Sequence, residues 1–92
     1  MEADLATLRN VEQTMLALAQ LMVDDPEDVR LEVILKPAET LIRLHVAPHD
    51  VGKLIGKEGR TARSLRIILS AIGMKYRHSF SLDIVESQEP RA

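Results

Sequence analysis

Two glycines separated by two residues mark the stretch of this chain whose residue types could do chemistry. Gly56 and Gly59 carry no Cβ, so the backbone can take positive φ and a charged polymer can approach it closely. The residues after Gly59 predict a helix, whose first N–H groups and positive dipole end favour an anion. Lys53, Lys57 and Arg60 surround the same point. We interpret the stretch as a loop that holds a phosphate backbone.

The charge distribution agrees with this interpretation, although the net charge of −2 does not. Residues 53–77 contain seven basic residues and one acidic residue, Glu58, so this segment carries a charge of +6 and the remainder of the chain carries −8. A chain polarised in this way is expected to present one positive face that contains the glycine loop. Glu58 is the feature that opposes phosphate binding.

Length and composition predict a single α+β domain. The chain has 92 residues, of which 46% are hydrophobic and 28% charged, as in ordinary globular domains. No apolar run approaches the roughly 18 residues of a membrane span. Glu2 and Asp4 stand where a secretory signal would have bases, so a cytoplasmic location is expected. Without cysteine, no disulfide or thiolate metal site is expected.

Hydrophobic periodicity predicts the elements of the first half. Residues 3–23 read as a helix that ends before Pro26, and residues 29–35 and 40–47 read as an antiparallel hairpin. Ile34 and Leu41 fall on the mainly polar strand faces and fit least well. The predicted apolar stripe of the helix consists of Leu8, Val11, Met15, Leu18 and Met22.

The second half predicts a short helix over 49–55, a helix over 60–72, a loop over 74–77 and a strand over 79–85. Gly52 inside the short helix suggests close contact with a neighbour or ligand, and Gly73 reads as the cap that ends the long helix. We expect one domain over 1–86, a polar tail over 87–92, strands in the order first, second, third, and helices on one face. The expected buried stripe of the long helix is Ala62, Leu65, Ile68, Leu69 and Ile72.

A family resemblance rests on the same loop. Leu54–Gly59 followed by Arg60–Leu65 resembles the signature of a KH domain, an RNA-binding module, and the longer run Pro48–Thr61 is similar to the stand-alone bacterial KH proteins of the KhpA family. The resemblance implies a type II KH fold, in which helices and strands follow one another in the order α-β-β-α-α-β. The three strands form one mixed sheet. The resemblance also implies single-stranded RNA binding, about four nucleotides at a time, without a cofactor.

The resemblance further implies a role as an RNA chaperone or post-transcriptional regulator, linked to cell elongation and division. The implied partners are a second copy in a homodimer and a larger RNA-binding protein of the KhpB type. The resemblance implies that Leu54 and Ile55 are apolar walls of the groove, with Arg43, His45 and Lys75–Arg77 as possible rims. The predicted RNA-binding residues are Gly52, Lys53, Leu54, Ile55, Gly56, Lys57, Glu58, Gly59, Arg60, Arg63, Lys75 and Arg77.

Other interpretations of these residues explain less. A plain helix–turn–helix accounts for the glycines but not for the charge beside them, and a nucleotide-binding P-loop fails on the glycine spacing and on Glu58 after Lys57. His45, His49 and His78 need not share a face, so no metal site is expected. No nucleophile has an evident base, so no enzyme is expected.

The main alternative function is a protein-interaction module that keeps the fold for dimerisation. Glu58 in the loop, the acidic remainder of the chain and surplus apolar residues favour it. Those surplus residues are Leu16, Leu21 and Ile67.

Overall fold

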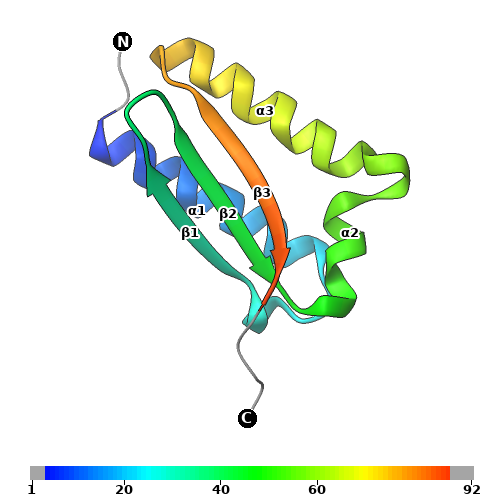
Figure 1. Ribbon diagram of the computed structural model, residues 1–92. Helices are drawn as coiled ribbons and strands as arrows, with labels where there is room; N and C mark the ends of the chain where they lie inside the picture. Colours follow the sequence, from blue (N-terminus) through cyan, green and yellow to red (C-terminus); the bar gives the residue numbers. More distant parts are fainter. Residues whose placement is uncertain (1–3, 88–92) are drawn as a thin grey trace.

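The computed structural model describes residues 4–87 (Figure 1). Its helices are α1 (Leu5–Met22), α2 (Val51–Ile55) and α3 (Arg60–Tyr76), and its strands are β1 (Arg30–Leu35), β2 (Thr40–Val46) and β3 (Phe80–Glu86). This is the α-β-β-α-α-β order expected from the sequence. The predicted tail lies, after Ser87, outside the described residues.

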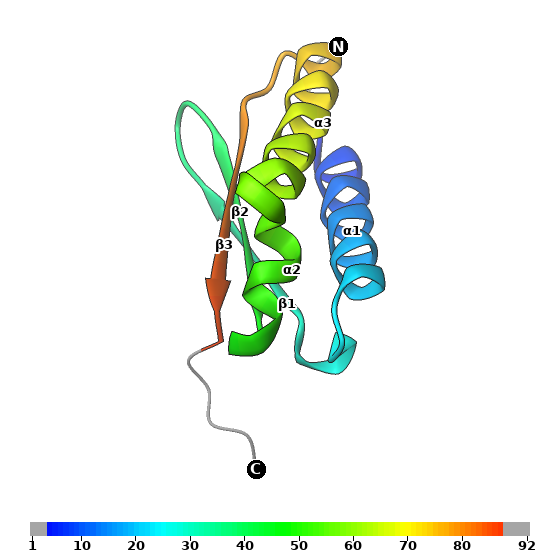
Figure 2. The same ribbon diagram turned by 90° about the vertical axis from the view of Figure 1, so that its right-hand side faces the viewer.

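The three strands form one mixed sheet in the order β1-β2-β3. β1 pairs with β2 antiparallel, whereas β3 lies parallel to β2, with Ile42 facing Val33 on one side and Leu82 on the other. The helices cover one face of this sheet and leave the other open (Figure 2). The predicted strand order and helix layer are therefore confirmed. No helix within residues 4–87 is long and apolar enough to cross a membrane.

The core lies between the sheet and the helix layer. Alternate residues of β2, namely Ile42, Leu44 and Val46, point at the helices and are buried, as period-two patterning requires. Each helix contributes a fully buried side chain to the same core: Met15 from α1, Leu54 from α2 and Leu69 from α3.

The open face of the sheet explains the two positions that fitted least well. Ile34 and Leu41 are directly opposite each other in the β1–β2 register, and Leu41 is only 7% exposed. The two apolar side chains pack against each other across the strands and shield each other from water on a mainly polar face. Beside it, the Arg43 guanidinium lies 3.6 Å from carboxylates of both Glu32 on β1 and Asp83 on β3.

The first helix begins later than predicted because Asp4 caps it. The Asp4 Oδ1 accepts a hydrogen bond of 2.9 Å from the Thr7 backbone N–H, so α1 starts at Leu5. Its core stripe is confirmed only in part. The buried residues of α1 are Val11, Met15 and Ala19, and the predicted Leu8, Leu18 and Met22 are half-buried.

The predicted end of the long helix is wrong. Gly73 lies inside α3, which continues to Tyr76 and ends where Arg77 takes a left-handed conformation with φ 53°. A Cβ on Gly73 would collide with the His78 carbonyl oxygen, so this glycine allows the chain to fold back closely. The predicted loop over 74–77 is therefore mostly helix. Ile68, predicted as core, is 47% exposed.

Candidate functional site

The glycine loop has an unusual run of backbone conformations. Gly56 has φ 78°, Glu58 φ 55° and Gly59 φ 73°. A Cβ on Gly56 would lie 2.8 Å from the Thr61 backbone nitrogen, so only glycine fits there. A Cβ on Gly59 would meet no atom within 4 Å, which leaves the outer surface of the loop open to a ligand.

Helix α3 starts directly after this loop, so its N-terminal end borders the loop. Gly59 precedes the first turn and provides no side-chain hydrogen bond to cap it. The Arg60 N–H already donates to the Lys57 carbonyl, but the positive end of the helix dipole still favours an anion at this place. No acidic residue occurs from Arg60 to Tyr76. The backbone and the charge of α3 thus both suit a phosphate.

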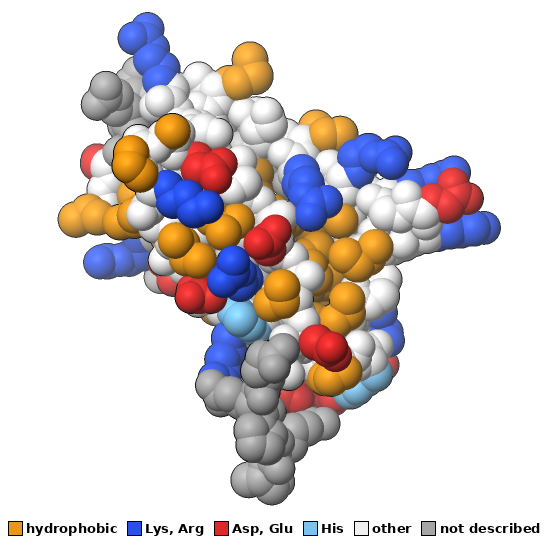
Figure 3. Space-filling view, in the orientation of Figure 1, with side chains coloured by type: hydrophobic (Ala, Val, Ile, Leu, Met, Phe, Trp, Pro, Cys, Tyr) orange, Lys and Arg blue, Asp and Glu red, His pale blue; other side chains and the backbone are white. Residues whose placement is uncertain are grey.

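The loop cations differ in how they are paired. Lys57 is exposed and forms no ion pair with another described residue. Arg60 Nη2 lies 3.7 Å from Glu58 Oε2, and both side chains are mostly exposed, so this pair is weak and open to exchange. Figure 3 shows Lys and Arg side chains gathered along α3 and at the α2–α3 junction. Glu58 therefore reduces the positive charge of the loop but does not cancel it.

The predicted apolar wall is only partly available. Leu54 is fully buried in the core, whereas Ile55 is half-buried beside the loop. The expected close contact at Gly52 is wrong within this chain, because a Cβ there would meet no atom within 4 Å. Gly52 lies on an exposed stretch of α2, so any close approach at this position would have to come from a ligand.

Lys53 points away from the glycine loop and joins a cluster that we call the Asp50 clasp. The cluster consists of Asp24, Asp25, His49, Asp50 and Lys53. The Lys53 Nζ lies 3.2 Å from Asp24 Oδ2 and 3.5 Å from Asp50 Oδ1. The fully buried Asp50 carboxylate accepts backbone N–H bonds from Asp24 and Asp25, at 3.0 and 3.1 Å. The clasp fastens the segment after α1 to the start of α2.

The electrostatics of the clasp are those of a satisfied structural cluster. Burial alone would raise the pKa of Asp50, but the two N–H donors, with His49 and Lys53 nearby, lower it below its ordinary value. The bond to Asp24 raises the pKa of Lys53. The His49 Nε2 lies 2.8 Å from Asp25 Oδ2.

The same cluster has the residue types of a metal site, since ligand atoms of Asp25, His49 and Asp50 lie within 4.8 Å of one another. The Asp50 carboxylate already pairs with the Lys53 ammonium and accepts hydrogen bonds from the two backbone N–H groups.

Sequence reasoning assigned Asp50 to the start of a helix and missed this cluster. Its hydrogen bonds join residues about 25 positions apart, for which the local sequence carries no signal.

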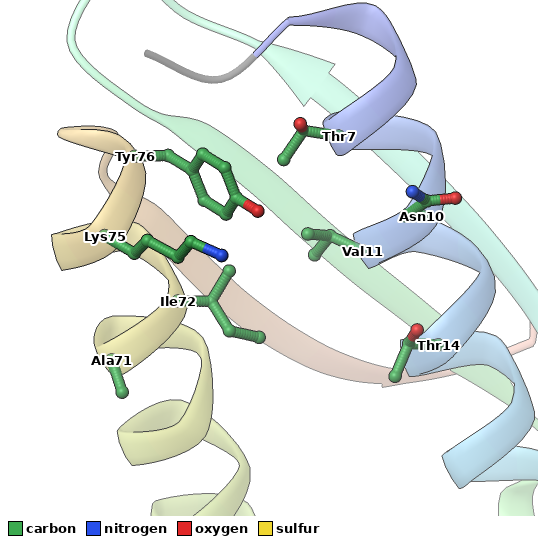
Figure 4. Close-up of a pocket in the computed structure, with 8 residues that line it drawn as sticks. All are labelled: Thr7, Asn10, Val11, Thr14, Ala71, Ile72, Lys75 and Tyr76. Atoms are coloured by element: carbon green, nitrogen blue, oxygen red, sulfur yellow. The ribbon is translucent and has the colours of Figure 1, made fainter. Parts of the chain in front are cut away.

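Lys75 and Arg77 lie far from the loop and on different flanks of α3. From Gly59 to Arg77 the helix advances about 27 Å. Lys75 faces α1 and lines a hollow of about 430 Å³ between the two helices, with its Nζ 5.0 Å from the centroid of the Tyr76 ring (Figure 4). Arg77 lines a different hollow, next to β3. Arg63, by contrast, lies one turn from Arg60.

The structure does not bring the expected groove rims of β2 to the loop. Arg43 and His45 alternate with the core residues of β2 and therefore lie on the open face of the sheet. The His45 Nε2 lies 3.1 Å from Glu32 Oε1, a contact that lowers the pKa of Glu32. These side chains belong to the ion-pair network of that face.

Comparisons with known proteins match most of the chain. The model of the family described as "KhpA/KhpB, KH domain" matches residues 12–84. A protein of Aquifex aeolicus named "RNA-binding protein KhpA" is 44% identical over 74% of this chain and 86% of its own length. Proteins of the same name from Halalkalibacterium halodurans and Clostridium perfringens are 41% and 35% identical, over 75% and 74% of this chain and 91% of their own length in both cases.

Proposed function

The chain belongs to the KhpA/KhpB KH-domain family, and we propose that it binds single-stranded RNA at the glycine loop, in the cytoplasm. The observation that carries this proposal is the loop itself. Its positive-φ backbone lies at the start of α3, which no side chain caps, beside a lysine that has no ion-pair partner among the described residues. The family is one of KH domains and not a class of enzymes.

The proposed clamp holds phosphates through Gly56, Lys57, Gly59 and Arg60, with Ile55 beside it as apolar wall. Arg63 extends it by one helical turn. The names of the relatives, which call them RNA-binding proteins, support RNA binding by this chain. Gly52 and Glu58 border the clamp, Leu54 supports it from the core, and Lys53, Lys75 and Arg77 lie outside it. We expect it to hold about four nucleotides.

We expect the binding to depend little on base sequence. Backbone N–H groups and cations contact phosphate, which carries no sequence information. The chain has one tyrosine and one phenylalanine, too few for a sheet that stacks bases on paired aromatics. Sequence-tolerant binding suits an RNA chaperone or post-transcriptional regulator. The link to cell elongation and division stays a prediction from the resemblance.

Fluorescence anisotropy with labelled RNA at several salt concentrations tests the proposal. If about three phosphates are neutralised, log affinity falls with log salt at a slope near about −2. Lys57→Asp, folded by circular dichroism, is expected to lose binding. Lys36→Asp makes the same charge change on the exposed β1–β2 turn and is expected to bind normally. RNA affinity that is insensitive to salt, or unchanged in Lys57→Asp, contradicts the proposal.

A second candidate function is protein interaction, through a homodimer or a larger partner of the KhpB type. It is favoured by large apolar side chains exposed on the helix layer. These are Leu5 and Leu21 on α1 and Ile67, Ile68 and Met74 on α3. Sedimentation tests it: Ile67→Glu is expected to weaken self-association. A strict monomer at high micromolar concentration contradicts the homodimer, and a dimer without RNA affinity favours an interaction module.

A further inference from the structure

The hollow between α1 and α3 lies away from the glycine loop, at the other end of α3, and has a volume of about 430 Å³ (Figure 4). Val11 from α1 and Ile72 from α3, which both pack in the core, form its apolar floor. Two other lining residues are small, Thr14 on α1 and Ala71 on α3, so the seam between the helices stays unfilled. The volume is that of a small-molecule site.

Lys75 is the one charged residue among the described residues that line this hollow. Figure 4 shows its side chain reaching from α3 toward α1, beside the Tyr76 ring. The ring attracts the ammonium group, 5.0 Å from its centroid, but leaves the positive charge uncompensated. Lys75 is exposed and forms no ion pair with another described residue. This end of the hollow therefore favours an anionic group.

The α1 side of the hollow offers uncharged hydrogen-bond donors. Asn10 and Thr14 are four residues apart, which places them on one face of α1. The Asn10 amide and the Thr14 hydroxyl can both donate, and so can the Lys75 ammonium. An ionised carboxylate only accepts hydrogen bonds, so it matches this set of donors.

A second hollow, of about 380 Å³, adjoins the first along α1 and is mainly apolar. Asn10 and Thr14 line both hollows. No charged residue of the described chain lines the second one, and Leu21 at its end is 84% exposed. An alkyl chain laid over it would be removed from water together with the surface it covers. Its remaining lining residues are Gln13, Ala17, Leu18 and Leu21.

The two hollows together, which we call the α1–α3 groove, are polar and cationic at one end and aliphatic at the other. Their only aromatic lining residue is Tyr76, whose ring contacts Lys75. We propose that the α1–α3 groove binds an aliphatic monocarboxylate of the fatty-acid class. The carboxylate lies at Lys75, and the chain runs past Thr14 toward Leu21. This site goes beyond the RNA-binding function, because it shares no residue with the clamp.

The chain carries its own reporter for this groove, since Tyr76 is its only tyrosine and it has no tryptophan. Titration of the full chain with sodium decanoate, below the micelle-forming concentration and without RNA, is expected to change the tyrosine emission along a saturating curve. Amide NMR shifts are expected at Asn10, Thr14 and Lys75. Emission that does not saturate, or shifts spread evenly over all exposed apolar residues, overturns the proposal.

Related ligands test the two ends of the groove separately. Decanol has the same chain without the charge and is expected to bind about fivefold more weakly, the upper range for an exposed ion pair. Octanoate keeps the charge but lacks two CH₂ groups. If about half of their surface is buried, it is expected to bind about fourfold more weakly. Equal affinities for decanoate and decanol overturn the proposal.

Substitutions at Lys75 assign the contact to this residue. Lys75→Gln is expected to lose about fivefold in affinity for decanoate and none for decanol. Lys75→Arg keeps the charge and is expected to bind decanoate as the native chain does. Lys36→Gln, which removes an exposed lysine from the β1–β2 turn, is the matched control and is expected to bind normally. Native decanoate affinity in Lys75→Gln overturns the proposal.

Filling the groove provides a second, independent variant. Ala71 is exposed, so Ala71→Leu is expected to remain folded by circular dichroism while it occludes the first hollow. It is expected to lose saturable binding of both decanoate and decanol. If Ala71→Leu instead abolishes self-association and the native chain binds no decanoate, the groove is a protein interface and the proposal is overturned.

The outcome is separable from that for the glycine loop. Decanoate binding is measured without RNA, so failure of the loop clamp in Lys57→Asp leaves this proposal standing. Conversely, a native chain that binds RNA at the loop but gives no saturable response to decanoate overturns only the α1–α3 groove. Lys75→Gln is expected to bind four-nucleotide RNA normally, because Lys75 lies outside the clamp.

Discussion

The two ends of α2 carry similar residues in opposite electrostatic situations. At its start, the clasp holds the Lys53 side chain, from the middle of α2, against Asp24 and Asp50. At its end, Lys57 is exposed on a loop where it forms no ion pair with the described residues. The two lysines are one helical turn apart in sequence. One cation is committed to the fold, and the other is available to a ligand.

This difference shows why a net charge summed over a segment overstates its binding surface. The +6 of residues 53–77 includes Lys53, which is neutralised inside the fold, and Arg66, which binds a strand carbonyl. The cations that remain available are those at the loop and on the exposed sides of α3. Substitutions at the two ends of α2 should therefore affect different quantities.

The largest effect is expected from Gly56→Ala. Position 56 combines φ 78° with ψ 173°, a conformation that is essentially restricted to glycine, and a Cβ would also collide with Thr61. We expect a loss of about 3 kcal/mol in the free energy of unfolding, together with loss of RNA affinity. Urea denaturation and anisotropy measure the two effects.

Gly52→Ala, a substitution inside α2, is the matched control for Gly56→Ala. Gly52 is helical and its Cβ position is open, so alanine is expected to stabilise the fold by about 0.5–1 kcal/mol. A destabilised Gly52→Ala would show that the space around α2 is not as described. A stable variant with weakened RNA affinity would show that RNA approaches this backbone closely.

Asp50→Asn should break the clasp without touching the loop. An amide has one acceptor oxygen where the carboxylate has two, and it cannot pair with Lys53. We expect the melting temperature to fall by about 10 °C. An unchanged melting temperature would mean that the clasp contributes little to the fold.

The difference in melting temperature between the native chain and Asp50→Asn should change with pH in a defined direction. Because the pKa of Asp50 in the folded chain lies below its ordinary 3.8, the ionised carboxylate stabilises the fold at neutral pH. This contribution is lost as the pH falls below 3.8 and through the lowered pKa. Other carboxylates titrate in both proteins, so the gap in melting temperature between native chain and Asp50→Asn should narrow below about pH 4. A gap that widens there contradicts the assignment.

Neutralising each lysine in turn compares the two ends of α2 directly. Lys57→Gln is expected to weaken RNA binding by about tenfold with little change in melting temperature. Lys53→Gln is expected to lower the melting temperature while RNA affinity changes less than about twofold. Anisotropy measures the RNA affinity of both variants, and thermal denaturation measures their melting temperatures. Equal losses of RNA affinity would remove the distinction between the two ends.

The smallest effect is expected from Glu58→Gln. Glu58 is exposed and pairs with Arg60 across 3.7 Å, so neutralising it frees that guanidinium and removes repulsion of phosphate. We expect RNA affinity to rise by about two- to threefold. The gain should shrink at high salt, where exposed charges are screened. Lower affinity in Glu58→Gln would instead indicate that the acid contacts the ligand.

Local patterns predicted most of the fold. Alternation in β2 and the apolar stripes of the helices set the buried faces, and the two spaced glycines marked the loop. Gly73 was misread because glycine serves two purposes. It can end a helix, or it can let another chain segment pack closely, and only the position of the His78 carbonyl decides between them.

The candidate site was less predictable for a similar reason. Lys53, Leu54, Lys75 and Arg77 have suitable types near a glycine loop, but their directions depend on tertiary packing. Leu54 faces the core, and Lys75 and Arg77 lie on opposite flanks of α3. The Asp50 clasp joins segments distant in sequence, and no local period reports such contacts.

The central claim is that the glycine loop contacts RNA, and backbone amide NMR shifts on adding a four-nucleotide RNA test it most directly. The largest shifts are expected at the amides of Gly56–Arg60 and in the first turn of α3. The amides of Asp24 and Asp25, held by the clasp, should shift little. Shifts concentrated around Arg43 and His45 on the open sheet face, with the loop unchanged, would contradict the claim.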